Sequence, residues 1–111
     1  MSRALLLDLG GSSLKAGVYE LNGKPLAIER VPNAFVEDEV DKAEQDPEAW
    51  WKALQTASDG LDKQIPGGLT GIEAVAICGF TRTQVFLNGE GEPVRPAIAF
   101  RDSRAHGTIE G

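Results

Sequence analysis

The sequence predicts an α/β fold in one small domain, and three observations lead to this prediction. Near the N-terminus, an apolar stretch and an alternating stretch flank a glycine turn, as in an antiparallel strand pair. A long amphipathic segment follows, with signals for a helix start and a helix stop. The near-continuous apolar run after it is typical of a strand covered on both faces. The chain has 111 residues, 41% of them hydrophobic, which permits a thin core.

Three strands are expected first. Residues 4–9 have the pattern of a buried strand, and residues 14–21 alternate as its antiparallel partner. Asn22-Gly23 favours a hairpin turn because both residues accept positive φ at low cost. Residues 25–32 then form the third strand. We expect the acidic stretch 33–45 to be a solvated loop.

A helix is expected after the acidic stretch. Asp46 is a good N-cap, Pro47 suits the first helical position, and Glu48 complements the helix dipole. Pro66-Gly67-Gly68 ends the helix. The large or apolar side chains on or beside one helical face, all expected to pack in the core, are Trp50, Trp51, Leu54, Ala57 and Leu61.

More strands are expected after the helix. Residues 72–78 should form a central strand, joined to the first strands through the helix. Cys78 at its end is interpreted as a small buried residue rather than a nucleophile. Residues 83–87 are predicted as a strand, 88–91 as a turn and 94–100 as an extended segment.

Composition limits the function classes. The net charge of −6 argues against a nucleic-acid binder, which would show a basic face. With a single cysteine and a single histidine, the chain has neither an internal disulfide nor a histidine–cysteine metal cluster. No basic segment precedes a long apolar stretch, so no membrane association is expected. These features together predict a cytoplasmic protein.

The turn after Asp8 has the parts of a phosphate–magnesium site. A Walker loop and a dinucleotide fingerprint are both excluded, because each needs a following helix and residues 14–21 alternate like a strand. Glycines allow close approach of an anion, and successive N–H groups form an anion nest. Asp8 is the candidate Mg²⁺ ligand. The candidate phosphate-binding residues are Gly10, Gly11, Ser12, Ser13 and Lys15. A simple hairpin with glycine in its turn is the alternative.

A second group of polar residues follows the expected central strand. In open α/β sheets, ligands gather outside the carboxyl ends of strands. Thr81, Arg82 and Gln84 offer hydrogen-bond donors there, suitable for a polyol. Asp102, between Arg101 and Arg104, can accept two sugar hydroxyls while its charge stays compensated. The alternative is a surface ion-pair cluster that caps a helix start at Asp102 or Ser103.

Taken in order, these segments resemble the N-terminal part of the FGGY carbohydrate kinases, the family of xylulose, glycerol and gluconate kinases. The first phosphate motif of that family, Asp-x-Gly-Thr-Ser/Thr-x-x-Lys/Arg, is similar to residues 8–15. A common family helix start resembles residues 46–51. The family block Gly-x-x-Leu-Arg-Pro-Ala-Ile-x-Trp-x-Asp-x-Arg-Ala resembles residues 91–105. Residues 79–83 fall where xylulose kinases carry Gly-Gln-Met-His-Gly.

The resemblance implies a partial ribonuclease-H-like fold of the actin-like ATPase superfamily, with the antiparallel meander first. It implies transfer of the ATP γ-phosphoryl group to a sugar or polyol hydroxyl, assisted by Mg²⁺. Asp8 would then lie near the metal, and residues 10–13 with Lys15 would line the phosphate path. Three residues would face the sugar: Thr81, Arg82 and Asp102.

Departures from the family pattern limit what is expected. Gly11 replaces the usual threonine, and Thr81-Arg82 replaces Met-His, so xylulose is a doubtful substrate. Family members are several-fold longer. Residues 1–111 therefore correspond to an N-terminal portion of the first kinase domain, without the second ATPase domain. The catalytic-base aspartate is expected beyond residue 111. Because phosphoryl transfer needs several parts at once, we expect this polypeptide to be inactive alone.

Two other functions are open at this point. The first is a non-catalytic module that binds a sugar or a partner, or that forms a homo-oligomer, through exposed sheet edges. The second is another actin-like protein, such as an acetate-kinase-like enzyme or a chaperone ATPase. The block at residues 95–104 argues against the second.

Overall fold

The computed structural model describes residues 2–33, 35–38, 42–79 and 82–105. The chain divides into two compact units. The first comprises Met1–Asn33 and Trp50–Phe80, and the second comprises Ala34–Ala49 and Thr81–Gly111. The α/β class is confirmed, since strands and a helix alternate as expected.

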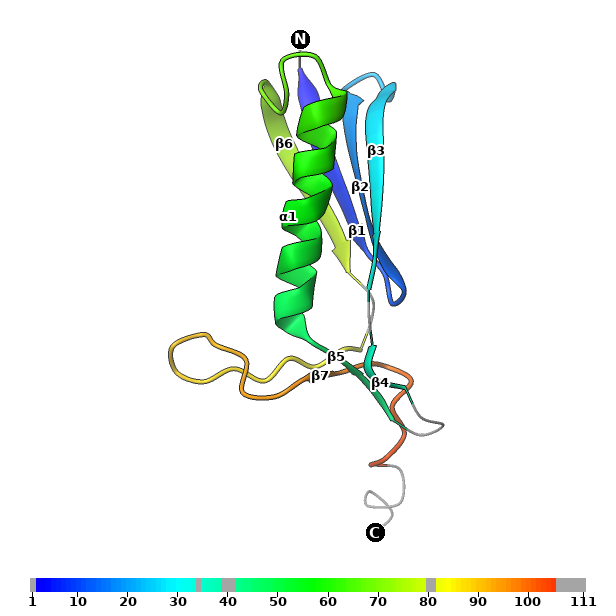
Figure 1. Ribbon diagram of the computed structural model, residues 1–111, viewed down its shortest axis with the longest axis vertical. Helices are drawn as coiled ribbons and strands as arrows, with labels where there is room; N and C mark the ends of the chain where they lie inside the picture. Colours follow the sequence, from blue (N-terminus) through cyan, green and yellow to red (C-terminus); the bar gives the residue numbers. More distant parts are fainter. Residues whose placement is uncertain (1, 34, 39–41, 80–81, 106–111) are drawn as a thin grey trace. The chain divides into compact units, whose positions relative to one another are not determined.

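The first unit contains a four-stranded sheet. Its strands are β1 (Arg3–Leu9), β2 (Ser13–Glu20), β3 (Pro25–Pro32) and β6 (Ile72–Gly79), in the order β3-β2-β1-β6 (Figure 1). The first three strands form the expected antiparallel meander, and β6 pairs with β1 in parallel. The hairpin at Gly23 is confirmed, with φ of 95° at that glycine.

The register of β1 and β2 sorts their side chains onto two faces. Leu7 lies opposite Ala16, and Leu9 lies opposite Leu14. These apolar residues belong to the core cluster or pack against it. Because strand side chains alternate, Asp8 and Lys15, also directly opposite each other, point to the other face. Both are exposed.

Helix α1 (Pro47–Gln64) covers the apolar face (Figure 1). The predicted N-cap is confirmed, because Asp46 Oδ1 accepts a hydrogen bond from the Glu48 N–H at 3.0 Å. The predicted end is confirmed too, since Gly67 and Gly68 adopt φ of 82° and 69°. In the described part of the chain, no helix is both long and apolar enough to cross a bilayer.

The core face of α1 agrees with the predicted one at Ala57 and Leu61, which are buried, and at Leu54, which packs against the core cluster. Its buried residues are Ala53, Ala57 and Leu61, while Trp51 is 58% exposed and Trp50 lies outside the core cluster. The expected core packing is therefore wrong for Trp51, while Trp50 is half-buried. Alanines let the helix approach the sheet closely, so the small residues face the strands.

Strand β6 also departs from the prediction, which placed it at the centre of a sheet. In the described structure β6 is an edge strand, and all its residues after Ile72 are exposed. Val75 and Ile77 are 62% and 68% exposed. Cys78 is exposed rather than buried. An apolar run predicts a strand, but coverage depends on the elements around it, and among the described residues none covers β6.

The second unit holds a three-stranded antiparallel sheet. Its strands are β4 (Phe35–Asp38), β5 (Ala43–Gln45) and β7 (Ala97–Ile98), in the order β4-β5-β7. The prediction of a solvated loop over residues 33–45 is therefore wrong, since β5 is buried throughout. Acidic side chains favour exposure to solvent. Here the pairing of β5 with β7, together with the two arginine partners of Glu44, offsets the cost of burying them.

The strand predicted over residues 83–87 was too long. Residues 83–87 make only the isolated bridges of Gln84 with Ile98 and of Leu87 with Pro93. Of the extended segment 94–100, only β7 forms a strand. The turn over residues 88–91 is confirmed, with the Gly91 N–H donating to the Asn88 carbonyl at 3.1 Å.

Leu61 tests the packing of helix on sheet, because its side chain is fully buried. We expect Leu61→Ala to lower the free energy of unfolding of the first unit by about 2–5 kcal/mol, through lost burial and the cavity left behind. Urea denaturation followed by tryptophan fluorescence measures this change. Leu21→Ala is the matched control, since Leu21 is 63% exposed. Equal losses from both variants would contradict the packing described here.

Candidate functional site

The turn between β1 and β2 is closed by its own backbone. The Gly10 N–H donates to the Ser13 carbonyl at 2.9 Å. Asn33 braces the turn from the end of β3: its side-chain amide donates to the Gly10 carbonyl at 2.8 Å, and its N–H donates to the Ser12 carbonyl at 2.8 Å. A Cβ at Gly10 would lie 3.2 Å from the Ser13 carbonyl oxygen. Gly10 therefore shapes the turn, and its N–H is not available to a ligand.

The remaining predicted phosphate residues differ in availability. A Cβ at Gly11 would meet no atom within 4 Å, so the space above this glycine is open. Ser12 is exposed, and its hydroxyl has no hydrogen-bond partner among the described residues. Ser13 is buried, and its hydroxyl accepts from Arg30 Nε at 3.1 Å. An anion could therefore approach over Gly11 and Ser12. Ser13 instead joins β2 to β3 through its hydrogen bond with Arg30.

A row of charged residues crosses the sheet on the face opposite α1. Asp8 on β1 lies opposite Lys15 on β2, and Lys15 lies opposite Arg30 on β3. Neither Asp8 nor Lys15 forms an ion pair within the described ranges. Both line a hollow of about 240 Å³ that also includes Tyr19. Sequence reasoning found Asp8 and Lys15 but missed Arg30, because only the register of β2 and β3 reveals that it is their neighbour.

The fit to magnesium depends on Asp8 alone. In the part of the chain that the structure describes, no three acidic, histidine or cysteine side chains are grouped closely enough to hold a metal ion. Mg²⁺ commonly binds one or two carboxylates and takes its other ligands from water and substrate phosphates. Asp8 is exposed, forms no ion pair within the described ranges and directly precedes the β1–β2 turn, so its carboxylate fits that mode.

In the second unit, Asp102 is fastened to β5 and to Arg104. Asp102 Oδ2 accepts from the Ala43 N–H at 3.0 Å and from Arg104 Nη2 at 2.6 Å. Asp102 Oδ1 accepts from the Arg104 N–H at 3.1 Å and from Arg104 Nε at 3.0 Å. Residues 102–105 form no helix, and residues 106–111 lie outside the described part of the chain, so the alternative of a helix cap at Asp102 or Ser103 is not tested.

Glu44 extends the cluster to a second arginine. Its Oε2 lies 2.7 Å from Arg104 Nη2 and 2.5 Å from Arg95 Nη2. Hydrogen bonds from Arg104 hold the pKa values of Asp102 and Glu44 below their ordinary values and outweigh burial, which acts in the opposite direction. The same bonds raise the pKa of Arg104 above its already high value.

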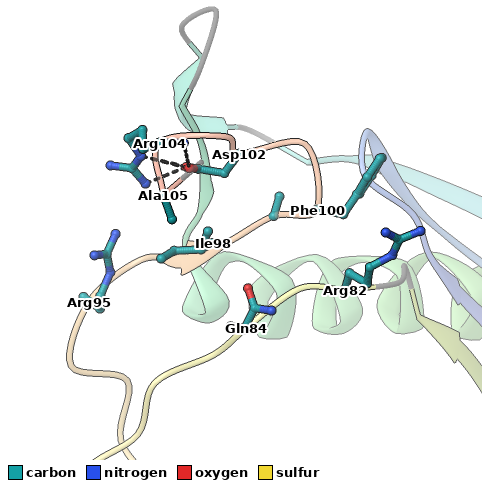
Figure 2. Close-up of a pocket in the computed structure, with 9 residues that line it drawn as sticks. Arg82, Gln84, Arg95, Ile98, Phe100, Asp102, Arg104 and Ala105 are labelled. Atoms are coloured by element: carbon teal, nitrogen blue, oxygen red, sulfur yellow. Dashed lines mark hydrogen bonds and ion pairs between the residues drawn. The ribbon is translucent and has the colours of Figure 1, made fainter. Parts of the chain in front are cut away.

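These charges border an open hollow of about 570 Å³ within the second unit (Figure 2). Arg82 and Asp102, both predicted as sugar-facing residues, line it, whereas Thr81 lies outside the described residues. Figure 2 shows Arg82 and Gln84 on one segment and Phe100 and Asp102 on another. Backbone hydrogen bonds of 3.0 Å in both directions between Gln84 and Ile98 join the two segments. The prediction missed the roles of Glu44 and Arg95, because their side chains meet only when β5 pairs with β7.

Comparison with known proteins identifies the family of this chain. Residues 3–111 match the model of the N-terminal domain of the FGGY family of carbohydrate kinases. The chain belongs to the FGGY family. The expected resemblance is thus confirmed, and so is the expected fold.

Among curated FGGY relatives, the xylulose kinase of Staphylococcus xylosus is 30% identical over 99% of this chain and 22% of its own length. The glycerol kinase of Aquifex aeolicus is 30% identical over 94% of this chain and 21% of its own length. This chain therefore spans about a fifth of the length of these relatives.

Solved structures of FGGY kinases have the same backbone fold as this chain. A xyloylose kinase from Brucella ovis superposes with a TM-score of 0.89 at 28% identity, over 95% of this chain and 22% of that one. The gluconate kinase of Lactobacillus acidophilus gives 0.85 at 23% identity, over 96% of this chain and 21% of that one, which supports the fold alone.

The Asp102–Arg104–Glu44 cluster predicts acid sensitivity in the second unit. Because the native pKa values of both carboxyls are lowered, the unfolded state binds more protons as pH falls. Their contribution to stability is therefore complete above about pH 5 and declines below about pH 4. We expect the protection factor of the Ala43 N–H, which donates to Asp102, to fall by about tenfold over this fall in pH, once its exchange rate is corrected for the intrinsic pH dependence of amide exchange.

Asp102→Asn should accelerate exchange at Ala43 even at pH 7 and weaken its dependence on acid. Asp59→Asn is the control, because Asp59 is an exposed residue of α1 in the other unit. NMR-detected exchange measures both variants. An unchanged Ala43 exchange rate in Asp102→Asn would refute the structural role of this carboxylate.

Proposed function

We propose that this protein takes part in ATP-dependent phosphorylation of a sugar or polyol hydroxyl. Family membership over residues 3–111 supports a carbohydrate kinase. The observation that carries the proposal is the β1–β2 turn, where Asp8 and Lys15 are exposed and form no ion pair among the described residues, and where a Cβ at Gly11 would meet no atom within 4 Å. Such a kinase would work in the cytoplasm, where ATP is available and a lone cysteine stays reduced.

The proposed nucleotide side consists of Asp8, Lys15 and residues 10–13. Lys15 would bind a phosphate oxygen as a point charge, and the backbone at Gly11 and Ser12 would face the phosphates. Gly10 and Ser13 would keep the turn in shape, through the contacts described above. Asp8 would hold Mg²⁺, which neutralises charge on the phosphates when bound.

The proposed sugar side consists of Thr81, Arg82 and Asp102. Arg82 lines the hollow and is exposed, so it can contact a ligand directly. The oxygens of Asp102 already accept from Ala43 and Arg104. Asp102 would therefore act mainly by positioning Arg104 at the hollow. The structure does not describe Thr81, whose proposed role comes from its place in the family motif.

The rest of the reaction would need more protein than this chain. Relatives are about five times longer, since the chain covers 20–22% of the xylulose kinases from Staphylococcus xylosus and Escherichia coli. We propose that residues 1–111 form an N-terminal portion of the first kinase domain. A base aspartate and an adenine pocket would come from the remainder, so the 111-residue chain alone would bind ligands without turnover.

This proposal predicts MgATP binding without ADP release. Amide NMR titration of the 111-residue chain should show shifts centred on residues 11–15. Lys15→Gln should weaken binding by about fivefold, the effect of removing one exposed charge contact to phosphate. A coupled ADP-release assay over a panel of polyols should show no turnover.

Lys24→Gln is the matched control for this titration. It removes the same charge from another exposed turn, and it should leave MgATP affinity unchanged. Shifts spread evenly over both units, or equal losses in the two lysine variants, would contradict a phosphate site at the β1–β2 turn. Turnover by the chain alone would contradict the proposed need for a remainder.

A second function, a module that self-associates, is favoured by one observation. The outer edge of β6 has no partner strand in the described part of the chain, and its apolar residues Val75 and Ile77 are mostly exposed. An exposed apolar edge strand is a template for pairing with another chain. In the 111-residue form, β6 of one copy could therefore pair with β6 of another.

Self-association through β6 predicts a concentration-dependent dimer. Sedimentation of the 111-residue chain should show dimers that Val75→Lys and Ile77→Lys abolish, because a lysine at an edge opposes pairing. Leu21→Lys is the control: Leu21 is 63% exposed but lies outside the four strands of the sheet. A monomeric wild-type chain at its solubility limit would exclude this function.

A further inference from the structure

The hollow of the second unit has one positive charge that finds no partner among the described residues. Three arginines line it, namely Arg82, Arg95 and Arg104. Two carboxylates compensate the last two, since Arg95 pairs with Glu44 and Arg104 pairs with both Glu44 and Asp102. Arg82 forms no hydrogen bond or ion pair through its guanidinium with any described residue. The hollow therefore presents one uncompensated cation to a ligand.

Asp102 is poorly suited to recognise the hydroxyls of a neutral sugar. A carboxylate offers about four lone-pair positions. The Ala43 N–H and three nitrogens of Arg104 already occupy them, at 2.6–3.1 Å. A sugar hydroxyl would have to displace one of these bonds, and the two that come from the guanidinium of Arg104 join opposite charges, which a neutral hydroxyl donor cannot match.

The backbone of Arg82 is held in an uncommon conformation. Its φ is 49°, in the left-handed region, and it is the one residue other than glycine with positive φ in the described ranges. Residues with a Cβ rarely adopt this conformation, and such outliers cluster at ligand sites. Figure 2 shows the Arg82 side chain on the segment that also carries Gln84, at the same hollow as Phe100.

The other residues of the hollow suit the polyol part of a ligand. The Gln84 amide can both donate to and accept from hydroxyls, and it has no side-chain partner among the described residues. Phe100 is 57% exposed and offers an apolar surface to the C–H groups of a sugar. Arg95, in contrast, already has partners within the protein. It pairs with Glu44, donates from Nε to the Pro96 carbonyl at 3.0 Å, and lies over the Phe86 ring.

We propose that Arg82 binds a carboxylate on the substrate, so that this site prefers a sugar acid to a neutral sugar. This inference rests on the proposed function, because it assigns the chemical class of the sugar in the same hollow. A planar guanidinium forms two parallel hydrogen bonds with a planar carboxylate, which gives both affinity and orientation. The hydroxyl-bearing chain of the acid would then lie along Gln84 and Phe100.

The test is an NMR titration of the 111-residue chain with three probes at constant ionic strength: D-gluconate, xylitol and D-xylulose. We expect gluconate to bind about tenfold more tightly than either neutral probe. Gluconate should shift the Arg82 Nε–H resonance, which the neutral probes should leave in place.

Variants separate the role of Arg82 from general charge. Arg82→Gln should remove the preference for gluconate over xylitol, so that the two affinities become equal, and Arg82→Lys should keep part of the preference, since an ammonium group cannot form the paired bonds. Arg101→Gln is the matched control, because Arg101 is a nearby exposed arginine that does not line the hollow. It should retain the full preference. Amide spectra verify that each variant is folded.

Four results would overturn the inference, and they are distinguishable. Equal affinity for gluconate and xylitol, or a preference that survives Arg82→Gln, would refute the role of Arg82 while leaving the sugar site intact. A loss of preference in Arg101→Gln as large as in Arg82→Gln would indicate a diffuse charge effect instead. Binding of none of the three probes would contradict the sugar site of the proposed function itself.

Discussion

The antiparallel register of β1 with β2 is the constraint on which the first unit depends. Opposite pairs such as Leu7 with Ala16 and Asp8 with Lys15 alternate along the two strands. Since side chains alternate with a period of two, a shift by one residue would bring Asp8 and Lys15 into the core. Burial of the leucines therefore fixes the outward position of the charged pair. The same pairing closes the turn at Gly10, so the core and the candidate phosphate site share one structural cause.

A different kind of constraint organises the second unit. Its sheet is small, and a buried charge network links its strands and loop. Glu44 is 5% exposed and would be costly to bury alone, but two arginines compensate it. Asp102 connects the loop to the backbone of β5 through Ala43. This network occupies the acidic groups of the hollow and leaves Arg82 as its available charge among the described residues.

The two units expose different kinds of surface. In the first, β6 presents apolar residues that other proteins bury, with Ile77 68% exposed. In the second, the hollow presents a cation, an amide and an aromatic ring. An apolar edge favours pairing with more protein, whereas a polar hollow favours a small ligand. Both properties agree with a chain that spans about a fifth of its FGGY relatives.

The sequence alone determined the local features of this protein. The Asp46 cap, the turns at Gly23 and Gly91, and the three-strand meander follow from short-range preferences of the residues involved, which act wherever the segment lies. The order of motifs likewise identified the FGGY family before any contact was known.

Only the tertiary structure decided which residues meet. Arg30 became a neighbour of Lys15 through strand register, and Glu44 met Arg95 and Arg104 through pairing of β5 with β7. The exposure of Trp51 and of β6 was likewise invisible in the sequence, because burial depends on what packs against a residue as well as on its hydrophobicity. Long-range contacts leave no periodic signal in the chain, so they emerge only when its segments are assembled.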